Sequence, residues 1–134
     1  MCLNALARYL LTVYQLSADG AAVRSVEIAN ALGVSRASVV KSLKKLAEGG
    51  FVQKEYYGSV HLTPQGLREA GRLHREYTLL SSYFTSCLAC PKAAAEKDAL
   101  CALCRFSPES KEQMIRLAQA QAGKSFFPKK QNTP

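Results

Sequence analysis

The stretch from Ser25 to Thr63 constrains the fold of this 134-residue chain most strongly. Apolar residues recur with helical spacing after Ser25, which is expected to cap a first short helix. Gly33 can adopt the left-handed conformation that ends a helix, and Ser35 can cap the next helix directly afterwards. Gly49 and Gly50 end that second helix. The stretch therefore predicts two short helices joined by a tight turn.

The second predicted helix, residues 35–48, has two different faces. The apolar face is expected to pack inward and consists of Val39, Leu43, Leu46 and Ala47. The opposite face carries a small residue, a hydroxyl and lysines: Ala37, Ser38, Lys41, Lys44 and Lys45. Residues 33–55 hold five basic and two acidic side chains, a net charge of +3. This face suits entry into the major groove of DNA, and the alternative is a helical hairpin with an ordinary solvated basic face.

Two alternating segments follow, residues 51–56 and 59–63, with Tyr57 and Gly58 at the turn between them. They predict a two-stranded wing. An amphipathic helix over residues 3–16 is expected to pack on the helix pair, and Val23 with Arg24 can add a short strand. The predicted fold class is mainly α, with a winged helix-turn-helix DNA-binding domain and a helical domain.

The remaining chain is predicted to be helical. Thr63 and Pro64 form a helix start, and about 24 residues follow without a strong breaker, which corresponds to roughly 36 Å of helix. So long a helix needs partners from the rest of the chain and from a second copy. Pro91 and Ser107 begin two further helices, and Gly123 is expected to end the last one. The predicted domains are 1–64 for DNA binding and 65–134 for dimerisation and sensing, with a basic C-terminal tail.

Composition limits the possible functions. The formal charge of +8 favours a polyanionic partner, above all double-stranded DNA. The N-terminus lacks the features of a signal peptide, and no apolar run is long enough to cross a membrane. Four of the five cysteines form two C-x-x-C pairs, which fits a reducing bacterial cytoplasm. No small-molecule substrate and no enzymatic activity are expected. One alternative is a winged-helix protein with a purely structural zinc site, and another is a cluster-carrying module that binds other proteins or has redox activity. A redox enzyme would need a βαβ unit or an acid–base pocket, and neither is visible.

The two C-x-x-C pairs are candidate metal ligands: Cys87, Cys90, Cys101 and Cys104. Their C-x2-C-x10-C-x2-C spacing is typical of four-cysteine ligation, and four thiolates can hold either Zn²⁺ or an iron–sulfur cluster. Two cysteines at positions i and i+3 of a helix share a face, so each pair can point its sulfurs the same way. The alternative is that these cysteines are small buried apolar residues, because both pairs lie in apolar contexts.

The segment VRSVEIANALGVSRASVVKSLKKLAEGGFVQ, the following YYGSVHLTPQG and the first helix YLLTVYQL resemble the diphtheria-toxin-repressor family, which includes manganese-transport regulators. The resemblance covers residues 5–80 well and 92–122 loosely. It implies a homodimeric, metal-responsive transcription regulator, in a short form without an SH3-like domain, that binds a palindromic operator. It also implies base-edge or groove contacts from Ser35, Ala37 and Lys41, and phosphate contacts from Arg36, Ser38 and Lys44. Lys45 and two wing residues, Tyr57 and Ser59, complete the predicted DNA-binding set.

The family's divalent-metal site does not carry over to this sequence. The ligand positions that the resemblance implies are occupied by Arg8, Leu11, His74, Thr78, Cys101, Cys104 and Arg105. Two arginines at such a site would repel a cation. The four-cysteine array is therefore the predicted sensor. Cys87 lies thirteen residues beyond His74, roughly 20 Å along a continuous helix, so His74 with Cys101 and Cys104 is the alternative metal site.

Overall fold

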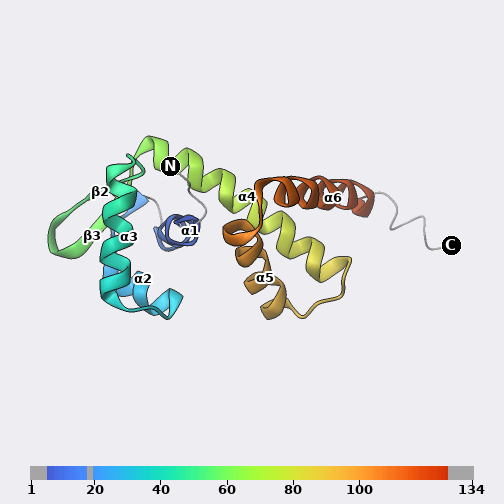
Figure 1. Ribbon diagram of the computed structural model, residues 1–134, viewed down its shortest axis with the longest axis horizontal. Coiled ribbons are helices and arrows are strands. Elements are labelled where there is room, and N and C mark those ends of the chain that lie inside the picture. The colour runs from blue at the N-terminus through green and yellow to red at the C-terminus, as the bar shows by residue number, and fades with distance from the viewer. Residues whose placement is uncertain (1–5, 18–19, 127–134) are drawn as a thin grey trace. The chain divides into compact units, whose positions relative to one another are not determined.

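The computed structural model describes residues 6–17 and 20–126 (Figure 1). The chain divides into two compact units, residues 1–74 and 75–134. Most described residues are helical and a small antiparallel sheet lies in the first unit, so the predicted fold class is confirmed. Within the described ranges, we find no helix with the length and apolar character needed to span a membrane.

Three helices build the core of the first unit: α1 (Ala7–Leu16), α2 (Ser25–Leu32) and α3 (Arg36–Glu48). Three of the four residues predicted for the apolar face of α3 are buried, with Val39 and Leu46 at 0% exposure, and the fourth, Ala47, is half-buried. Leu10, Val13 and Ile28 are equally buried on the other two helices. The first helix was predicted from residue 3, and residues 3–5 lie outside the described part of the chain.

The turn between α2 and α3 follows the sequence prediction, whereas the start of α2 does not. Gly33 adopts a left-handed φ of 67°, and the backbone N–H of Ser38 donates to the side-chain oxygen of Ser35 at 3.1 Å. Ser25, however, is the first residue of α2 and is buried; Arg24 precedes it in an extended conformation and provides no side-chain cap. The predicted cap was wrong because the strand containing Arg24 runs directly into the helix.

The wing belongs to a three-stranded antiparallel sheet in the order β1-β3-β2, made of β1 (Val23–Arg24), β2 (Val52–Lys54) and β3 (Ser59–Leu62). Val23 pairs with Val60, so the predicted short strand does complete the sheet. The turn is longer than the expected two residues, because a 3-10 helix, η2 (Tyr56–Gly58), joins β2 to β3. In Figure 1 the hairpin lies beside α3.

A tight junction attaches the wing to the end of α3 and to the next helix. The hydroxyl of Thr63 donates to the carbonyl oxygen of Gly50 and accepts from the backbone N–H of Gly66 at 3.0 Å, which caps α4 (Pro64–Ser86) as predicted. The N–H of Thr63 also donates to the carbonyl of Phe51 at 3.1 Å. A side chain at Gly66 would overlap the backbone of Phe51. This junction fixes where the wing leaves the helix-turn-helix.

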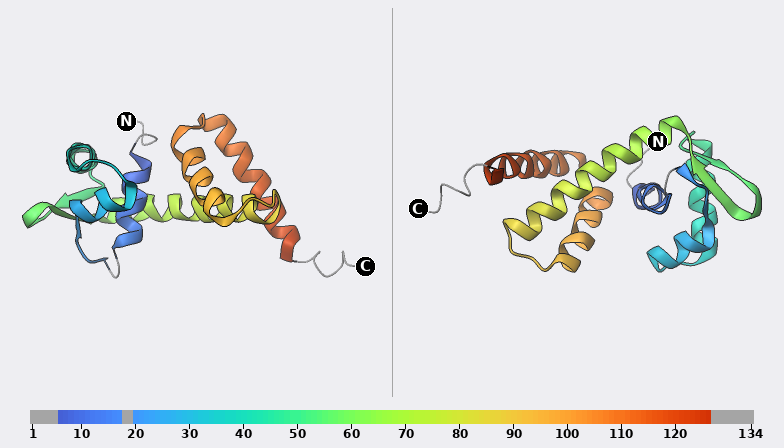
Figure 2. Two further views of the ribbon diagram at one scale, coloured as in Figure 1. Left: turned by 90° about the horizontal axis from the view of Figure 1, so that it is seen from below. Right: turned by 180° about the vertical axis from the view of Figure 1, so that it is seen from behind.

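The second unit packs the C-terminal part of α4 with α5 (Lys92–Arg105) and α6 (Pro108–Phe126) (Figure 2). The buried core is rich in alanine and consists of Leu80, Phe84, Ala95, Ala99, Ala102, Leu103 and Ala118. Ser107 caps α6 through the N–H of Ser110 at 3.2 Å, as predicted. The predicted end at Gly123 was wrong, because the helical hydrogen bonding continues through it to Phe126. Residues 127–134, which include most of the predicted basic tail, lie outside the described part.

Candidate nucleic-acid interface and cysteine pairs

The outward face of α3 carries the side chains that the sequence predicted for DNA binding. All of its predicted contact residues are exposed: Ser35, Arg36, Ala37, Ser38, Lys41, Lys44 and Lys45. Because Val39, Leu43 and Leu46 are buried on the opposite side, the helix cannot rotate to hide its cationic face without exposing apolar surface. The arrangement presents positive charge and hydroxyl groups on a rigid helix, which is the chemistry that phosphates and base edges require.

Two exposed residues between α3 and the wing, one on each element, were not among the predicted DNA-contact residues. Val40 is 53% exposed, and Lys54 is exposed at the end of β2. Both line a cavity of about 200 Å³ between the helix and the wing, together with Glu55 and Ser59. The helical position of Val40, four residues after Arg36 and four before Lys44, could have indicated that it lies beside the cationic face.

The wing turn is held by its own hydrogen bonds. The hydroxyl of Ser59 donates to the carbonyl oxygen of Tyr56 at 2.9 Å, and Gly58 adopts a φ of 71° that favours glycine. Across the strands, the carboxylate of Glu55 lies against the Nδ1 atom of His61. The side chain of Tyr57, a predicted contact residue, lies outside the described part of the structure. The half-buried Ser59 hydroxyl can still accept a hydrogen bond from a ligand.

The four cysteines predicted to share one metal centre do not form one in the structure. Cys87 and Cys90 follow the last residue of α4, before α5 begins, whereas Cys101 and Cys104 lie in the last turns of α5. Cys101 is about 14 Å along the helix axis from the first residue of α5. Sulfur atoms that share a tetrahedral zinc lie only about 4 Å apart. Across residues 6–17 and 20–126, no three His, Cys, Asp or Glu side chains form a group that could hold a metal ion.

The positions that the family resemblance assigns to a divalent cation hold side chains with other roles. The guanidinium of Arg8 lies 5.2 Å from the centre of the Tyr9 ring, a cation–π contact, and Leu11 is 2% exposed in the core. The ring of His74 lies 5.3 Å from that of Tyr14, at an angle of 47°. These residues do not fit a divalent metal, and the alternative site built on His74 is not formed either.

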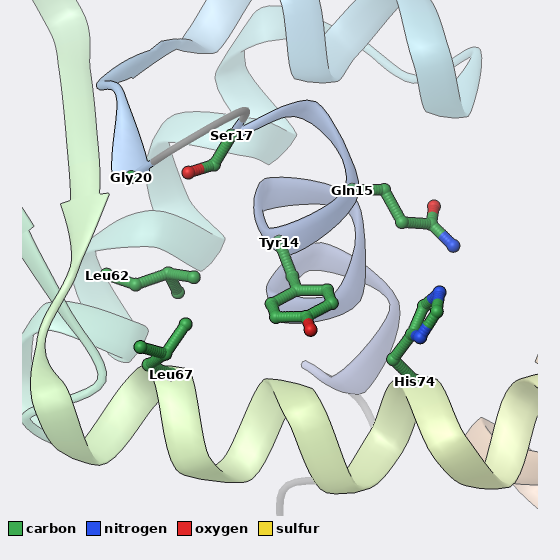
Figure 3. Close-up of a pocket in the computed structure, with 7 residues that line it drawn as sticks. All are labelled: Tyr14, Gln15, Ser17, Gly20, Leu62, Leu67 and His74. Carbon is green, nitrogen blue, oxygen red and sulfur yellow. The ribbon is translucent and has the colours of Figure 1, made fainter.

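His74 instead belongs to the wall of a cavity of about 530 Å³ in the first unit. Figure 3 shows Tyr14 and Gln15 of α1 beside His74 of α4, with Leu62 and Leu67 on the other side of the cavity. Leu67 is 54% exposed. The aromatic contact between Tyr14 and His74 joins α1 to α4, so the structure gives this histidine a packing role.

The N-terminal part of the chain matches the model of a known protein family. The model for "iron dependent repressor, N-terminal DNA binding domain" matches residues 3–60. The transcriptional regulator MntR of Salmonella typhimurium is 32% identical over 75 residues, which cover 56% of this chain and 48% of that protein. The HTH-type transcriptional regulator MntR of Lysinibacillus sphaericus is 35% identical over 71 residues, which cover 53% of this chain and 51% of that protein. This chain spans about half the length of the curated relatives it matches.

Solved structures share the fold over a longer part of the chain. The manganese regulator SloR aligns with a TM-score of 0.70 at 23% identity, over 85% of this chain and 53% of its own. The IdeR structure of T. acidophilum aligns with a TM-score of 0.67 at 24% identity, over 82% of this chain and 52% of its own. The likeness to these structures therefore extends from the winged helix into the helices that follow it.

Proposed function

Because this chain belongs to the diphtheria-toxin-repressor family of metal-dependent transcriptional regulators, we propose that it binds double-stranded operator DNA as a homodimer and regulates transcription. The DNA-binding part is the winged helix of residues 1–64, and residues 65–134 provide dimerisation and sensing. We place the protein in the cytoplasm, where its operator would be, and assign it no catalytic activity.

The observation that supports this proposal best is the exposed face of α3. Arg36, Lys41, Lys44 and Lys45 project from a helix whose other side is fixed in the core. Such a helix can enter a major groove about 12 Å wide, with its N-terminal residues toward the base edges. We assign Ser35, Ala37 and Lys41 to contacts in the major groove. The residues assigned to the sugar-phosphate backbone of the DNA are Arg36, Ser38, Lys44, Lys45, Tyr57 and Ser59.

A homodimer would present two copies of this helix to one duplex. Productive binding requires the two reading helices to lie about one DNA turn, roughly 34 Å, apart, and the two-fold symmetry of the dimer requires a palindromic operator. A signal received by the second unit would shift the population between dimers with the correct helix spacing and dimers without it, and DNA binding would change accordingly. Repression is the direction of regulation that the family favours.

DNA binding can be measured with the full chain and a fluorescently labelled duplex of arbitrary sequence, followed by selection from a randomised duplex pool. The variant Lys44→Ala/Lys45→Ala should weaken binding and reduce the slope of log K against log salt by about two, because two phosphate contacts are lost. The selected sequences should contain inverted repeats whose centres are about one helical turn apart.

The matched control is Lys92→Ala/Lys97→Ala, which removes the same charge from exposed positions on α5. It should leave the salt slope of the parent chain unchanged. Equal losses in the two variants would show that binding follows net charge rather than the α3 face. A parent chain that binds no duplex at low salt, or that sediments as a monomer when bound, would contradict the proposal.

The effector is a separate part of the proposal. The spacing of the four cysteines supports a sensor that binds zinc or an iron–sulfur cluster. Their positions at opposite ends of α5 do not fit one centre within a single chain. We therefore assign sensing to the cysteine-containing second unit as a whole.

A further inference from the structure

The two C-x-x-C pairs differ in the backbone that carries them. Cys101 and Cys104 lie inside α5, where helical hydrogen bonds fix the backbone of both residues. Cβ atoms at i and i+3 of a helix are about 5–6 Å apart, whereas a disulfide requires about 3.5–4.5 Å. This second pair cannot form an internal disulfide without distorting the helix.

The first pair spans the C-terminal turn of α4, where the N–H of Cys87 makes the last regular helical hydrogen bond, to the carbonyl of Tyr83 at 2.8 Å. Cys87 follows Ser86, the last residue of α4, and Cys90 precedes the first residue of α5. Between them Ala89 has a φ of 57°, a conformation that residues other than glycine rarely adopt. This turn bends the chain back, so that the N–H of Cys90 donates to the carbonyl of Phe84 at 2.9 Å. The backbone from Leu88 to Cys90 is not helical, so the i, i+3 spacing of a regular helix does not fix the separation of these two sulfurs.

The two thiols of the first pair also differ in access. Cys87 is exposed and lines a cavity of about 240 Å³ between α4 and α6, next to Ser86 and Tyr83. Cys90 is only partly exposed and packs against the alanine-rich core of the second unit. A small oxidant can therefore reach Cys87 more easily than Cys90, which provides a second thiol three residues away to complete the reaction.

We propose that Cys87 and Cys90 form a reversible dithiol–disulfide site that is oxidised by hydroperoxides. The sulfur of Cys87 attacks the peroxide oxygen and becomes a sulfenic acid, with release of water from hydrogen peroxide. The sulfur of Cys90 then displaces the sulfenic hydroxyl, which leaves as a second water, and the S–S bond forms. The two thiols lose two electrons and the peroxide gains them. A low-molecular-weight dithiol reverses the reaction by exchange.

The sequence allows this site to be assayed directly, independently of DNA binding. Trypsin cleaves after Arg75, Lys92, Lys97 and Arg105, so peptide 76–92 contains the first pair and peptide 98–105 the second. A disulfide within a pair stays in one peptide, whereas a bond between pairs links two. The full chain is treated with substoichiometric to excess hydrogen peroxide, blocked with a thiol alkylating reagent, digested and analysed by mass spectrometry.

Peptide 76–92 should lose two hydrogens and resist alkylation at peroxide doses about tenfold lower than peptide 98–105 requires. Reduction with dithiothreitol should restore both thiols. In Cys90→Ser the reaction should stop at Cys87, where a cyclic dione reagent traps the sulfenic acid. The matched variant Cys104→Ser should oxidise its first pair as the parent chain does.

Three results would overturn the proposal: oxidation of peptide 98–105 first, equal trapping of sulfenic acid at Cys87 and Cys101, or a predominant crosslink between the two peptides. The last would show that the pairs meet, and would support the shared four-thiol centre in place of a dithiol switch.

Discussion

The hydroxyl oxygen of Thr63 lies 2.6 Å from the carbonyl oxygen of Gly50, and this hydrogen bond joins two segments on either side of the wing. Gly50 follows α3, and Thr63 lies between β3 and α4. The same hydroxyl caps α4 through Gly66. One side chain therefore fixes the base of the wing relative to the helix that carries the candidate DNA-binding face.

Replacing Thr63 with valine should lower the stability of the first unit. Valine keeps the shape of threonine but leaves the Gly50 carbonyl and the Gly66 N–H without that partner, a loss of about 1–2 kcal/mol in the free energy of unfolding. Urea unfolding followed by circular dichroism measures it. Serine at this position keeps the hydroxyl and serves as the control, with a smaller loss; equal losses for valine and serine would contradict the role of the hydrogen bonds.

Gly66→Ala tests the same junction sterically. The added methyl group would overlap the carbonyl oxygen of Phe51, and this obstacle is backbone that cannot move aside as a side chain can. The free energy of unfolding should fall by about 1–3 kcal/mol or more. Arg68→Ala, at an exposed position two residues farther along α4, is the control. There alanine should be neutral or stabilising because it favours the helix, so a similar loss at both positions would point to a general effect on α4.

Ser35 allows helix capping to be separated from DNA contact. Its side chain accepts the N–H of Ser38 at the start of α3, and it is also exposed at the candidate interface. Ser35→Ala should cost about 1 kcal/mol of stability, whereas Ser35→Asp should keep the cap. Aspartate should nevertheless weaken DNA binding sharply, since its carboxylate would face phosphates. Ser35→Asn should keep the cap without adding a charge. The three variants are compared by thermal unfolding, which measures stability, and by titration with a DNA duplex, which measures binding. Unchanged DNA binding by the aspartate variant would exclude Ser35 from the interface.

The features that could be predicted from the sequence are those formed by residues close together in the chain. The caps at Ser35 and Thr63 and the turn at Gly33 obey backbone rules that operate over a few residues, and all three are present. The long helix α4 was likewise evident from the absence of breakers. The predicted cap at Ser25 failed because strand pairing of Arg24 with Ser59, a long-range contact, determined where α2 begins.

The candidate metal site shows the limit of spacing rules. C-x2-C-x10-C-x2-C describes distance along the chain, but the ten intervening residues fold mostly into α5, which separates the pairs instead of closing a loop between them. The contact of His74 with Tyr14 joins residues sixty positions apart, and no local pattern indicates it. Gly123 lies inside α6 because a single glycine costs a helix only about 1 kcal/mol.

If His74 packs against Tyr14 rather than binding metal, an aromatic ring without ligand atoms should replace it well. His74→Ala should lose about 1–3 kcal/mol because the contact between α1 and α4 is lost, and His74→Phe should lose less because it keeps a ring against Tyr14. Calorimetric titration of the parent chain and of His74→Phe with Mn²⁺ should show no difference between them. A metal affinity present in the parent and abolished in the phenylalanine variant would restore His74 as a ligand.

The second unit should lose stability at alkaline pH through Tyr77. Burial, and secondarily the carboxylate of Glu96, raise the pKa of this phenol above its ordinary value. Since the folded-state pKa exceeds that of the unfolded chain, the contribution of Tyr77 is fully present below about pH 10 and is lost as the pH rises through the folded-state pKa. Thermal unfolding between pH 8 and about 11 should therefore show a decline that Tyr77→Phe reduces. Glu96→Gln should make the decline smaller, because removing the smaller cause brings the folded-state pKa of Tyr77 closer to that of the unfolded chain. An identical pH profile for the parent chain and Tyr77→Phe would mean that another group controls the alkaline loss.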